Sequence, residues 1–142
     1  MAAIVTLQAN VLLNVTLGTT TWTGSGAPVP PMHIRLTTTA PTASAAGTEL
    51  GGGTGYTTGG TAIAFNSASA GSATGPNSGT GVISWTNGSG GTWNIVGAEI
   101  WDTAGTPLRW WFGTWTGYPP GITVNNGSVF QINLAGLTVQ LS

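Results

Sequence analysis

Catalytic chemistry in this chain would have to use very few side chains. The 142-residue sequence has one histidine, His33, and three carboxylates, Glu49, Glu99 and Asp102. A serine nucleophile would need His33 as its base, yet no serine lies in a strand–turn–helix motif that presents such a nucleophile. Glu99 and Asp102 are candidates for glycoside hydrolysis, but strand alternation would direct them to opposite faces. The sequence therefore predicts a protein that is not an enzyme.

Metal, cofactor and nucleic-acid sites are equally poorly supported. With no cysteine and one histidine, the chain offers no clustered metal ligands. The glycine-rich runs at 51–55 and 87–91 lack the lysine and hydroxyl of a phosphate-binding loop. Two arginines and no lysine cannot form a basic patch for phosphates. We therefore expect no metal, no cofactor, no nucleic acid and, without an 18-residue apolar run, no membrane partner.

The segment LRWWFGTWTG, at 108–117, is the strongest candidate for a binding surface, because it holds three of the seven tryptophans. Strand alternation separates two rows of side chains: Leu108, Trp110 and Phe112 on one face, and Arg109, Trp111 and Trp115 on the other. We assign the first row to the core. In the second row Gly113 leaves a shallow gap between the two rings, and Arg109 can lie over Trp111 as a cation–π pair.

Three interpretations of the second row stay open. It can be buried between two sheets, form a subunit interface, or stack on sugar rings. Tryptophan and arginine are enriched where proteins meet, and a sugar site would need more acidic or amide partners. We predict that Arg109, Trp111 and Trp115 contact another protein.

Short strands must position these residues. Alternating runs bounded by turn residues predict strands at 32–37, 61–66, 81–86, 92–101, 107–115, 127–134 and 136–142. Asn125-Asn126-Gly127 predicts a tight turn, and 37–60 predicts a long Gly/Thr/Ser-rich surface loop. The expected fold over 1–142 is a single all-β domain, an antiparallel β-sandwich or barrel-like variant of about eight short strands.

The first twenty residues are expected to form an N-terminal strand or extended arm. From Ala3 to Leu17 every odd position is apolar, a period of two that favours a strand. A helix stays open as the alternative, because Val5, Ala9 and Leu13 would then share one face with Leu12 and Thr16. An arm of this kind can add a strand to a partner's sheet. Its predicted interface residues are Val5, Leu7, Val11, Leu13 and Val15.

Charge is nearly absent from the chain. Charged residues make up 4% of the sequence, and the formal net charge is −1. The surface must therefore consist of neutral polar and small residues, which repel copies of the same protein only weakly. We expect a homo-oligomer or a subunit of a larger assembly. The first residues lack a basic, uninterrupted secretory signal, so we expect assembly in the cytoplasm.

A set of short motifs follows one order along most of the chain. They are Thr39-Ala40-Pro41-Thr42, Gly47-Thr48-Glu49 and Tyr56 in the loop, then Trp93, Trp101-Asp102, Leu108, Trp111, Gly113 and Gly127. In this order they resemble the small tailed-bacteriophage virion proteins commonly labelled tail fibre proteins. Two features depart from that family: Thr57 and Thr58 stand where it usually has an arginine, and its first segment often looks helical.

The resemblance implies a noncatalytic virion protein. Within that class we expect a capsid decoration or cement protein, displayed in multiple copies and bridging neighbouring capsid subunits. Its expected partner is the major capsid protein, and its location the virion, assembled in the host cytoplasm. A fibre usually needs a trimerising stalk, and the chain has no heptad or collagen-like repeat. The alternative is a tail fibre or host adhesin that binds cell-surface glycan through Trp111 and Trp115.

Overall fold

The computed structural model describes residues 6–21, 26–115, 117–118 and 120–141. These residues form one short helix and ten strands. The elements are α1 (Thr6–Thr16), β1 (Met32–Thr37), β2 (Thr61–Ile63), β3 (Ser72–Gly75), β4 (Ile83–Thr86), β5 (Trp93–Ile95), β6 (Gly97–Trp101), β7 (Arg109–Thr114), β8 (Ile122–Val124), β9 (Val129–Ile132) and β10 (Leu137–Gln140). The fold is all-β, as predicted, with more strands than the eight expected.

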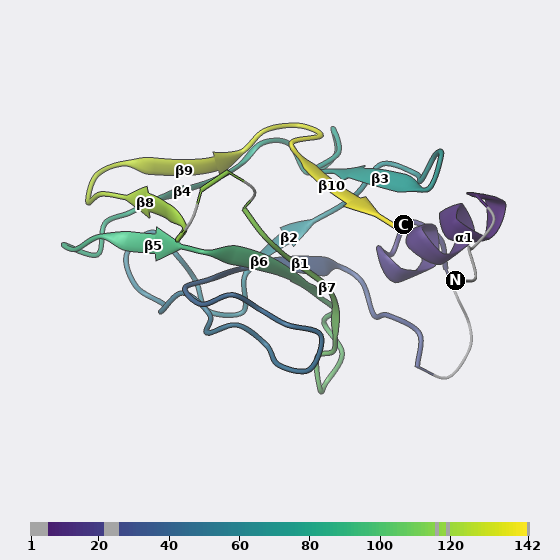
Figure 1. Ribbon diagram of the computed structural model, residues 1–142, viewed down its shortest axis with the longest axis horizontal. Helices are drawn as coiled ribbons and strands as arrows, with labels where there is room; N and C mark the ends of the chain where they lie inside the picture. Colours follow the sequence, from purple (N-terminus) through teal and green to yellow (C-terminus); the bar gives the residue numbers. More distant parts are fainter. Residues whose placement is uncertain (1–5, 22–25, 116, 119, 142) are drawn as a thin grey trace.

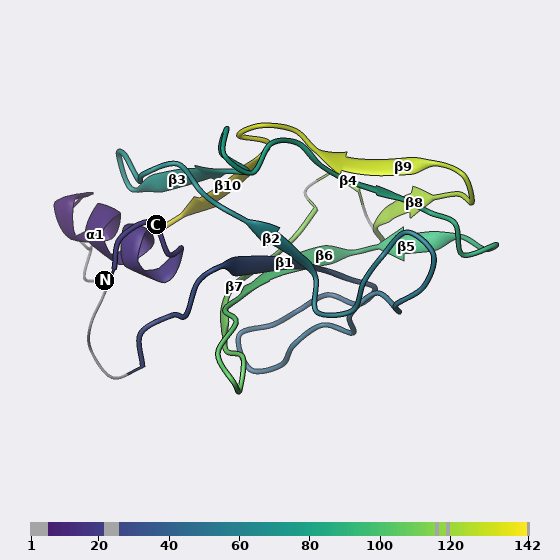
Figure 2. The same cartoon turned by 180° about the vertical axis from the view of Figure 1, so that it is seen from behind.

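All strand pairs are antiparallel, and they form four sheets. The largest has the order β2-β1-β6-β7, and the pairs β10-β3, β4-β9 and β5-β8 form separate two-stranded sheets. Figures 1 and 2 show β3, β10, β4 and β9 along one side of the molecule and the four-stranded sheet along the other. The described strands do not close into a barrel. The side formed by β3, β10, β4 and β9 is not one continuous sheet, and the sandwich arrangement stays a prediction.

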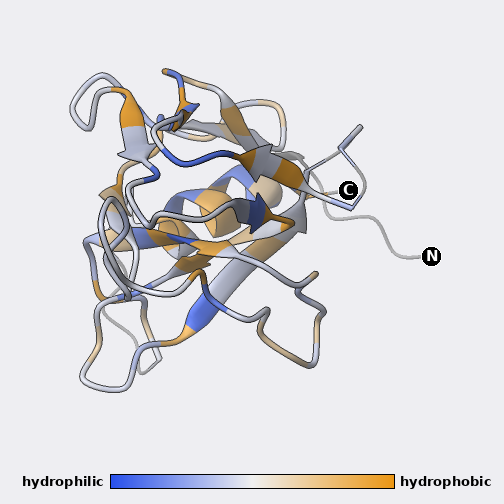
Figure 3. Cartoon of the chain, turned by 90° about the vertical axis from the view of Figure 1, so that its left-hand side faces the viewer, coloured by the Kyte–Doolittle hydropathy of each residue, from blue (hydrophilic) through white to orange (hydrophobic). Residues whose placement is uncertain are grey.

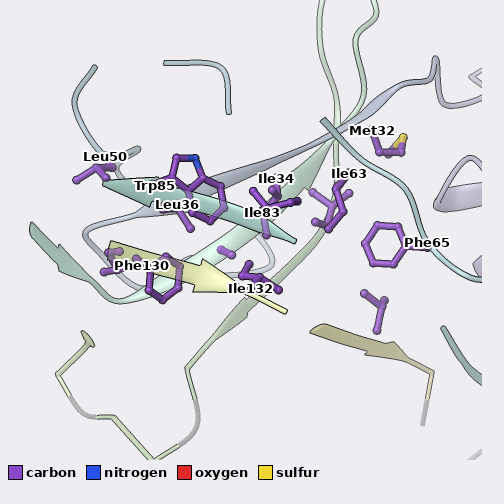
Figure 4. Close-up of a cluster of buried hydrophobic side chains, with 14 of the residues drawn as sticks. Met32, Ile34, Leu36, Leu50, Ile63, Phe65, Ile83, Trp85, Phe130 and Ile132 are labelled. Carbon is purple, nitrogen blue, oxygen red and sulfur yellow. The ribbon is translucent and has the colours of Figure 1, made fainter. Parts of the chain in front are cut away.

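The core lies between these two sides because one row of each strand is apolar. In β1, Met32, Ile34 and Leu36 are buried, whereas His33 and Arg35 are only partly covered on the opposite face. Side chains of β4 and β9 meet this row, with the rings of Trp85 and Phe130 stacked 5.8 Å apart (Figure 4). Seen from the end of the molecule, apolar stretches occur on strands around the interior (Figure 3).

Most predicted strands are present, and the differences have local causes. The expected strand at 92–101 is two strands, β5 and β6, because the chain leaves one partner at Val96 and joins another. Two strands, β3 and β8, were not predicted, because their sequences SATG and ITV are too short to show a period. The predicted turn is present: the Ser128 amide donates to the Asn125 carbonyl (2.9 Å), and Gly127 has a φ of 83°.

The prediction of an N-terminal strand or arm is wrong for residues 6–16, which form α1. Ala9, Leu13 and Leu17 are buried, and they are spaced by four residues. A spacing of four fits a period of two as well as a helical period of 3.6, so the alternation did not distinguish them. The segment contains no glycine or proline that would break a helix.

Polar side chains of α1 fix the helix against the strands. Asn10 Oδ1 accepts a hydrogen bond from the Gly71 amide (2.8 Å), and Asn14 Oδ1 accepts one from the Ala68 amide (2.6 Å). Thr16 Oγ1 accepts one from Trp111 Nε1 (3.0 Å). The helix is thus an integral part of the domain. No helix among the described residues is long and apolar enough to cross a membrane.

Candidate protein-binding site

The segment 108–115 lies at the edge of the four-stranded sheet, and a bulge exchanges its two predicted faces. β7 pairs with β6 as Ile100↔Trp111, but the next pair is Trp101↔Arg109, so Trp110 is an extra residue. The predicted core residues Leu108 and Phe112 are 49% and 45% exposed. The predicted binding residues Trp111 and Trp115 instead pack, half-buried, against the core. The core assignment was therefore wrong for Leu108 and Phe112, whereas Trp110 does pack against the core. The predicted contact of Trp111 and Trp115 with another protein stays a prediction.

Arg109 lies on the outer face of the sheet, where it holds the long loop. Its Nη1 donates to Glu99 Oε1 (2.8 Å) and to the Ala45 carbonyl (2.8 Å), and its Nη2 donates to the Thr42 carbonyl (2.7 Å). Its guanidinium carbon lies 4.9 Å from the centre of the Phe112 ring. The expected cation–π pair with Trp111 is wrong, because the bulge places Arg109 on the face of Phe112.

Glu99 completes this connection from β6. It is 2% exposed, and its Oε1 also accepts from the Gly47 amide (2.9 Å), while its Oε2 accepts from Trp101 Nε1 (2.9 Å). Both carboxylate oxygens are therefore occupied by donors of the same chain. A buried carboxylate needs such partners, because an unpaired buried charge is costly.

A second ion pair attaches the loop at Glu49, two residues after Gly47. Arg35 Nη1 lies 3.9 Å from Glu49 Oε2, and the Arg35 guanidinium carbon is 4.2 Å from the centre of the Trp101 ring. Glu49 Oε1 accepts from the Tyr56 hydroxyl (2.8 Å) and from the Gly59 amide (2.7 Å). Burial raises the pKa of Tyr56 well above its usual value, and the hydrogen bond to Glu49 raises it further. Tyr56 therefore stays a neutral donor.

Asp102 closes the turn between β6 and β7. Its Oδ1 accepts from the Leu108 amide (2.8 Å) and its Oδ2 from Trp110 Nε1 (3.1 Å). Burial is the largest single influence on its pKa and raises it. The hydrogen bonds from Leu108, Trp110 and Ala104 together outweigh burial, so the pKa of Asp102 lies below its usual 3.8.

Replacing Asp102 with asparagine is expected to lower the free energy of unfolding at pH 7 by about 1–3 kcal/mol, because charge-assisted hydrogen bonds are lost. At a pH above the pKa of Asp102 in the unfolded protein, the lowered pKa stabilises the folded state. This contribution disappears as the pH falls through the pKa of Asp102 in the folded protein. The difference between wild type and Asp102→Asn should therefore shrink below pH 3.8. Urea unfolding between pH 2 and 7 measures it; a difference that is constant over this range contradicts the assignment.

The inner face of β7 borders a groove of about 380 Å³. Its lining comes from β6, β7 and β10: Ala98, Ile100, Trp111, Phe112, Gly113, Thr114, Trp115, Gly136, Leu137, Thr138, Val139 and Gln140. None of these residues is charged, and Trp111 and Trp115 form its aromatic wall. Two of the three predicted β7 interface residues therefore lie at a concave, neutral surface.

The two tryptophans frame an open space at Gly113. A Cβ atom built on Gly113 meets no atom within 4 Å, so the gap expected between the rings is present. The Trp115 ring packs edge-on against Phe130 at 5.6 Å, and its buried Nε1 has no hydrogen-bond acceptor. An indole N–H that is shielded from water normally has a partner, so this buried donor is an exception in the fold.

The predicted interface residues of the N-terminal segment do not share one face. Leu13 is completely buried and cannot contact a partner, whereas Val11 is 57% exposed and Val15 is half-buried. The side chain of Leu7 and all of Val5 lie outside the described residues. Helical geometry separates these positions because successive odd residues turn by about 200° around the axis.

The residues considered for catalysis are engaged separately. His33 Nδ1 lies 3.1 Å from the Gly59 carbonyl oxygen, Glu99 is paired with Arg109, and Asp102 holds its own turn. Among the described residues, no group of three or more histidine, aspartate or glutamate side chains could hold a metal ion. These contacts lie within the fold, whereas the groove beside β7 is an open surface lined by uncharged side chains.

Residues of β10 that line the groove were not predicted as part of a site. The strand itself was expected at 136–142, but nothing in its sequence indicates that it would lie opposite β7. Comparisons of the chain with protein-family models, curated sequences and solved structures each found no significant match.

Proposed function

We propose that this protein is a noncatalytic structural subunit of a tailed-bacteriophage virion, most specifically a capsid decoration protein that bridges neighbouring capsid subunits. One observation carries the proposal: the charged side chains are used inside the molecule. The ion-paired side chains of Arg35, Glu49, Glu99 and Arg109 are 20% exposed or less, and Asp102 is buried. The remaining surface is neutral, which favours dense packing of many copies.

Exposed apolar side chains support contact with other proteins. Phe112 lies on β7 and Leu108 directly before it, Val11 and Leu12 lie on α1, and Val129 lies on β9; each is more than two-fifths exposed. Apolar residues spread over several sides suit a subunit that touches more than one neighbour. The order of motifs that resembles virion proteins supports a neighbour within the virion, and the major capsid protein is the partner that we propose.

The runner-up function is a tail fibre or host adhesin. It would need flat, accessible ring faces for sugar stacking. Trp111 and Trp115 are half-buried, and their edges contact Thr16 and Phe130. This arrangement favours packing and the lining of a groove over an open sugar platform, so the adhesin ranks second.

Location on the particle tests the proposal. An antibody raised against the folded protein is expected to label the heads of intact virions at many positions by gold-label electron microscopy. Particles made without the protein should release DNA at a lower temperature, and added purified protein should restore the original value. Label confined to the tail, with tryptophan quenching by cell-wall glycan that Trp115→Ala abolishes, would support the adhesin. Absence of label from virions would contradict both functions.

A further inference from the structure

The groove beside β7 lies between two strand edges. β7 is the last strand of its sheet, and β10 pairs with β3 alone. Residues of both strands line the same 380 Å³ groove, and their elements lie near one another in Figure 1. The opposite edge of the large sheet is β2, which is only three residues long, whereas β7 has six. Short edge strands resist pairing with other chains, so β7 is the less protected edge.

The hydrogen-bond pattern shows which backbone groups of β7 are free. The Trp115 amide donates to the Val96 carbonyl (3.3 Å), so this residue faces β6. Because alternate residues of an antiparallel ladder face the same neighbour, Trp111 and Gly113 also bond to β6. Phe112 and Thr114 therefore direct their N–H and C=O groups away from β6. Both residues line the groove.

The same pattern holds for β10. The Leu141 amide donates to the Gly71 carbonyl (3.2 Å), which turns Leu137 and Val139 toward β3. Thr138 and Gln140 then direct their backbone groups away from β3, and both line the groove. Among the described residues, none of the free-edge amides of β7 and β10 donates to another backbone group outside these ladders.

We propose that this groove accepts an extended, uncharged segment of another protein, which adds a strand between β7 and β10. The inference rests on the proposed function, since the segment would belong to a neighbouring virion protein. Main-chain hydrogen bonds to the two edges would provide affinity, and apolar side chains at alternate positions would pack on Trp111 and Trp115. The segment must be uncharged because the lining has no charge to pair with a buried ion.

Two free edges identify the kind of segment. A strand that already belongs to a sheet has one edge occupied and can pair with β7 or with β10, but not with both. Pairing between the β7 strands of two copies therefore does not fill the groove. The second copy's β7 already has β6 on its other edge, and that β6 would collide with β10 of the first copy. An unpaired arm or loop has both edges free.

The chain offers variants that block the groove and keep the fold. Gly113→Val places a side chain in open space at a residue without positive φ, and valine favours strands. Thr114→Pro and Thr138→Pro each remove a free-edge N–H but no ladder bond. Gly105→Val is the matched control, since its Cβ also meets nothing within 4 Å and lies outside the groove. Circular dichroism and thermal melting establish that each variant is folded.

The probe is an acetylated, amidated seven-residue peptide of alternating threonine and valine, titrated into the isolated protein by NMR. We expect shifts of the amides of Phe112, Thr114, Thr138 and Gln140 and of the Trp115 indole N–H. Gly113→Val, Thr114→Pro and Thr138→Pro should each weaken binding about tenfold or more, whereas Gly105→Val should not. A peptide with a central lysine should bind at least about tenfold more weakly. Failure of the first peptide to bind, or binding that these variants leave unchanged, overturns the proposal.

Hydrogen exchange on assembled particles separates this inference from the proposed function. If the protein labels virion heads, the free-edge amides of Phe112, Thr114, Thr138 and Gln140 should exchange about tenfold or more slowly on the particle than in the free protein. Unchanged exchange there, with label on the heads, rejects the groove and leaves the capsid role standing. Peptide binding without label on virions rejects the capsid role alone. A wild-type dimer in ultracentrifugation that Thr114→Pro makes monomeric shows edge pairing between copies and overturns the inserted segment.

Discussion

Replacing Glu99 with alanine is expected to lower the free energy of unfolding by about 3–5 kcal/mol, the range for removing one partner of a buried ion pair. The change leaves the Arg109 guanidinium without its carboxylate, and it removes the acceptor of the Gly47 amide and of Trp101 Nε1. Buried donors without acceptors add to the loss. Denaturant unfolding followed by tryptophan fluorescence measures this difference.

Two further variants identify the cause. Glu99→Gln keeps an acceptor oxygen and removes the charge, so it should lose less stability than Glu99→Ala. If Glu99 and Arg109 act together, the double variant Glu99→Ala with Arg109→Ala should be more stable than the sum of the single losses predicts. A loss under about 1 kcal/mol for Glu99→Ala, the level of an exposed surface pair, would show that this network does not hold the loop.

Replacing Leu13 with alanine is expected to cost about 2–5 kcal/mol, because it removes a completely buried side chain and leaves a cavity. Val11→Ala is a matched control on the same helix. Val11 is 57% exposed, so this substitution should change the free energy of unfolding by no more than about 0.5 kcal/mol. An extended arm of alternating residues would make Val11 and Leu13 equivalent, so the two variants distinguish helix from arm. Equal losses of stability for Leu13→Ala and Val11→Ala would contradict the helical packing of this segment.

The helix also changes what truncation should do. Removal of an independent arm would leave an intact domain, whereas removal of residues 6–17 takes away the buried Leu13 and Leu17 and the acceptors of the Gly71, Ala68 and Trp111 N–H groups. Loss of capsid binding after such a truncation would therefore report unfolding. Single substitutions at exposed positions such as Val11 are the appropriate test of whether this region contacts a partner.

The use of charge connects fold and proposed function. Arg35 with Glu49, and Arg109 with Glu99, hold the middle of the 37–60 loop against the outer face of the sheet, and Asp102 closes the adjacent turn. A long glycine-rich loop loses much conformational entropy when it is ordered, so strong local attachments are needed. The same attachments leave the outer surface neutral, which suits a subunit that packs closely against many others.

Composition and short-range patterns in the sequence were enough to predict the all-β class, most of the strands and one tight turn. A period of two is a property of neighbouring residues, so β1 was predicted with its bounds, and the strands at 81–86, 127–134 and 136–142 were placed within two or three residues. The turn at Asn125-Asn126-Gly127 followed from the local preference of asparagine and glycine for positive φ. The small number of charges predicted a neutral surface.

Only the tertiary structure decided the features that depend on distant partners. α1 forms because Leu13 and Leu17 find a core and Asn10 and Asn14 find amides near β3, which alternation cannot indicate. The bulge at Trp110 depends on pairing with β6, and it reverses the faces on which Trp111 and Phe112 lie. The groove exists because β7 and β10, separate in sequence, end as facing edges. Local sequence fixes which face a residue shares with its neighbours, but pairing and packing decide what that face meets.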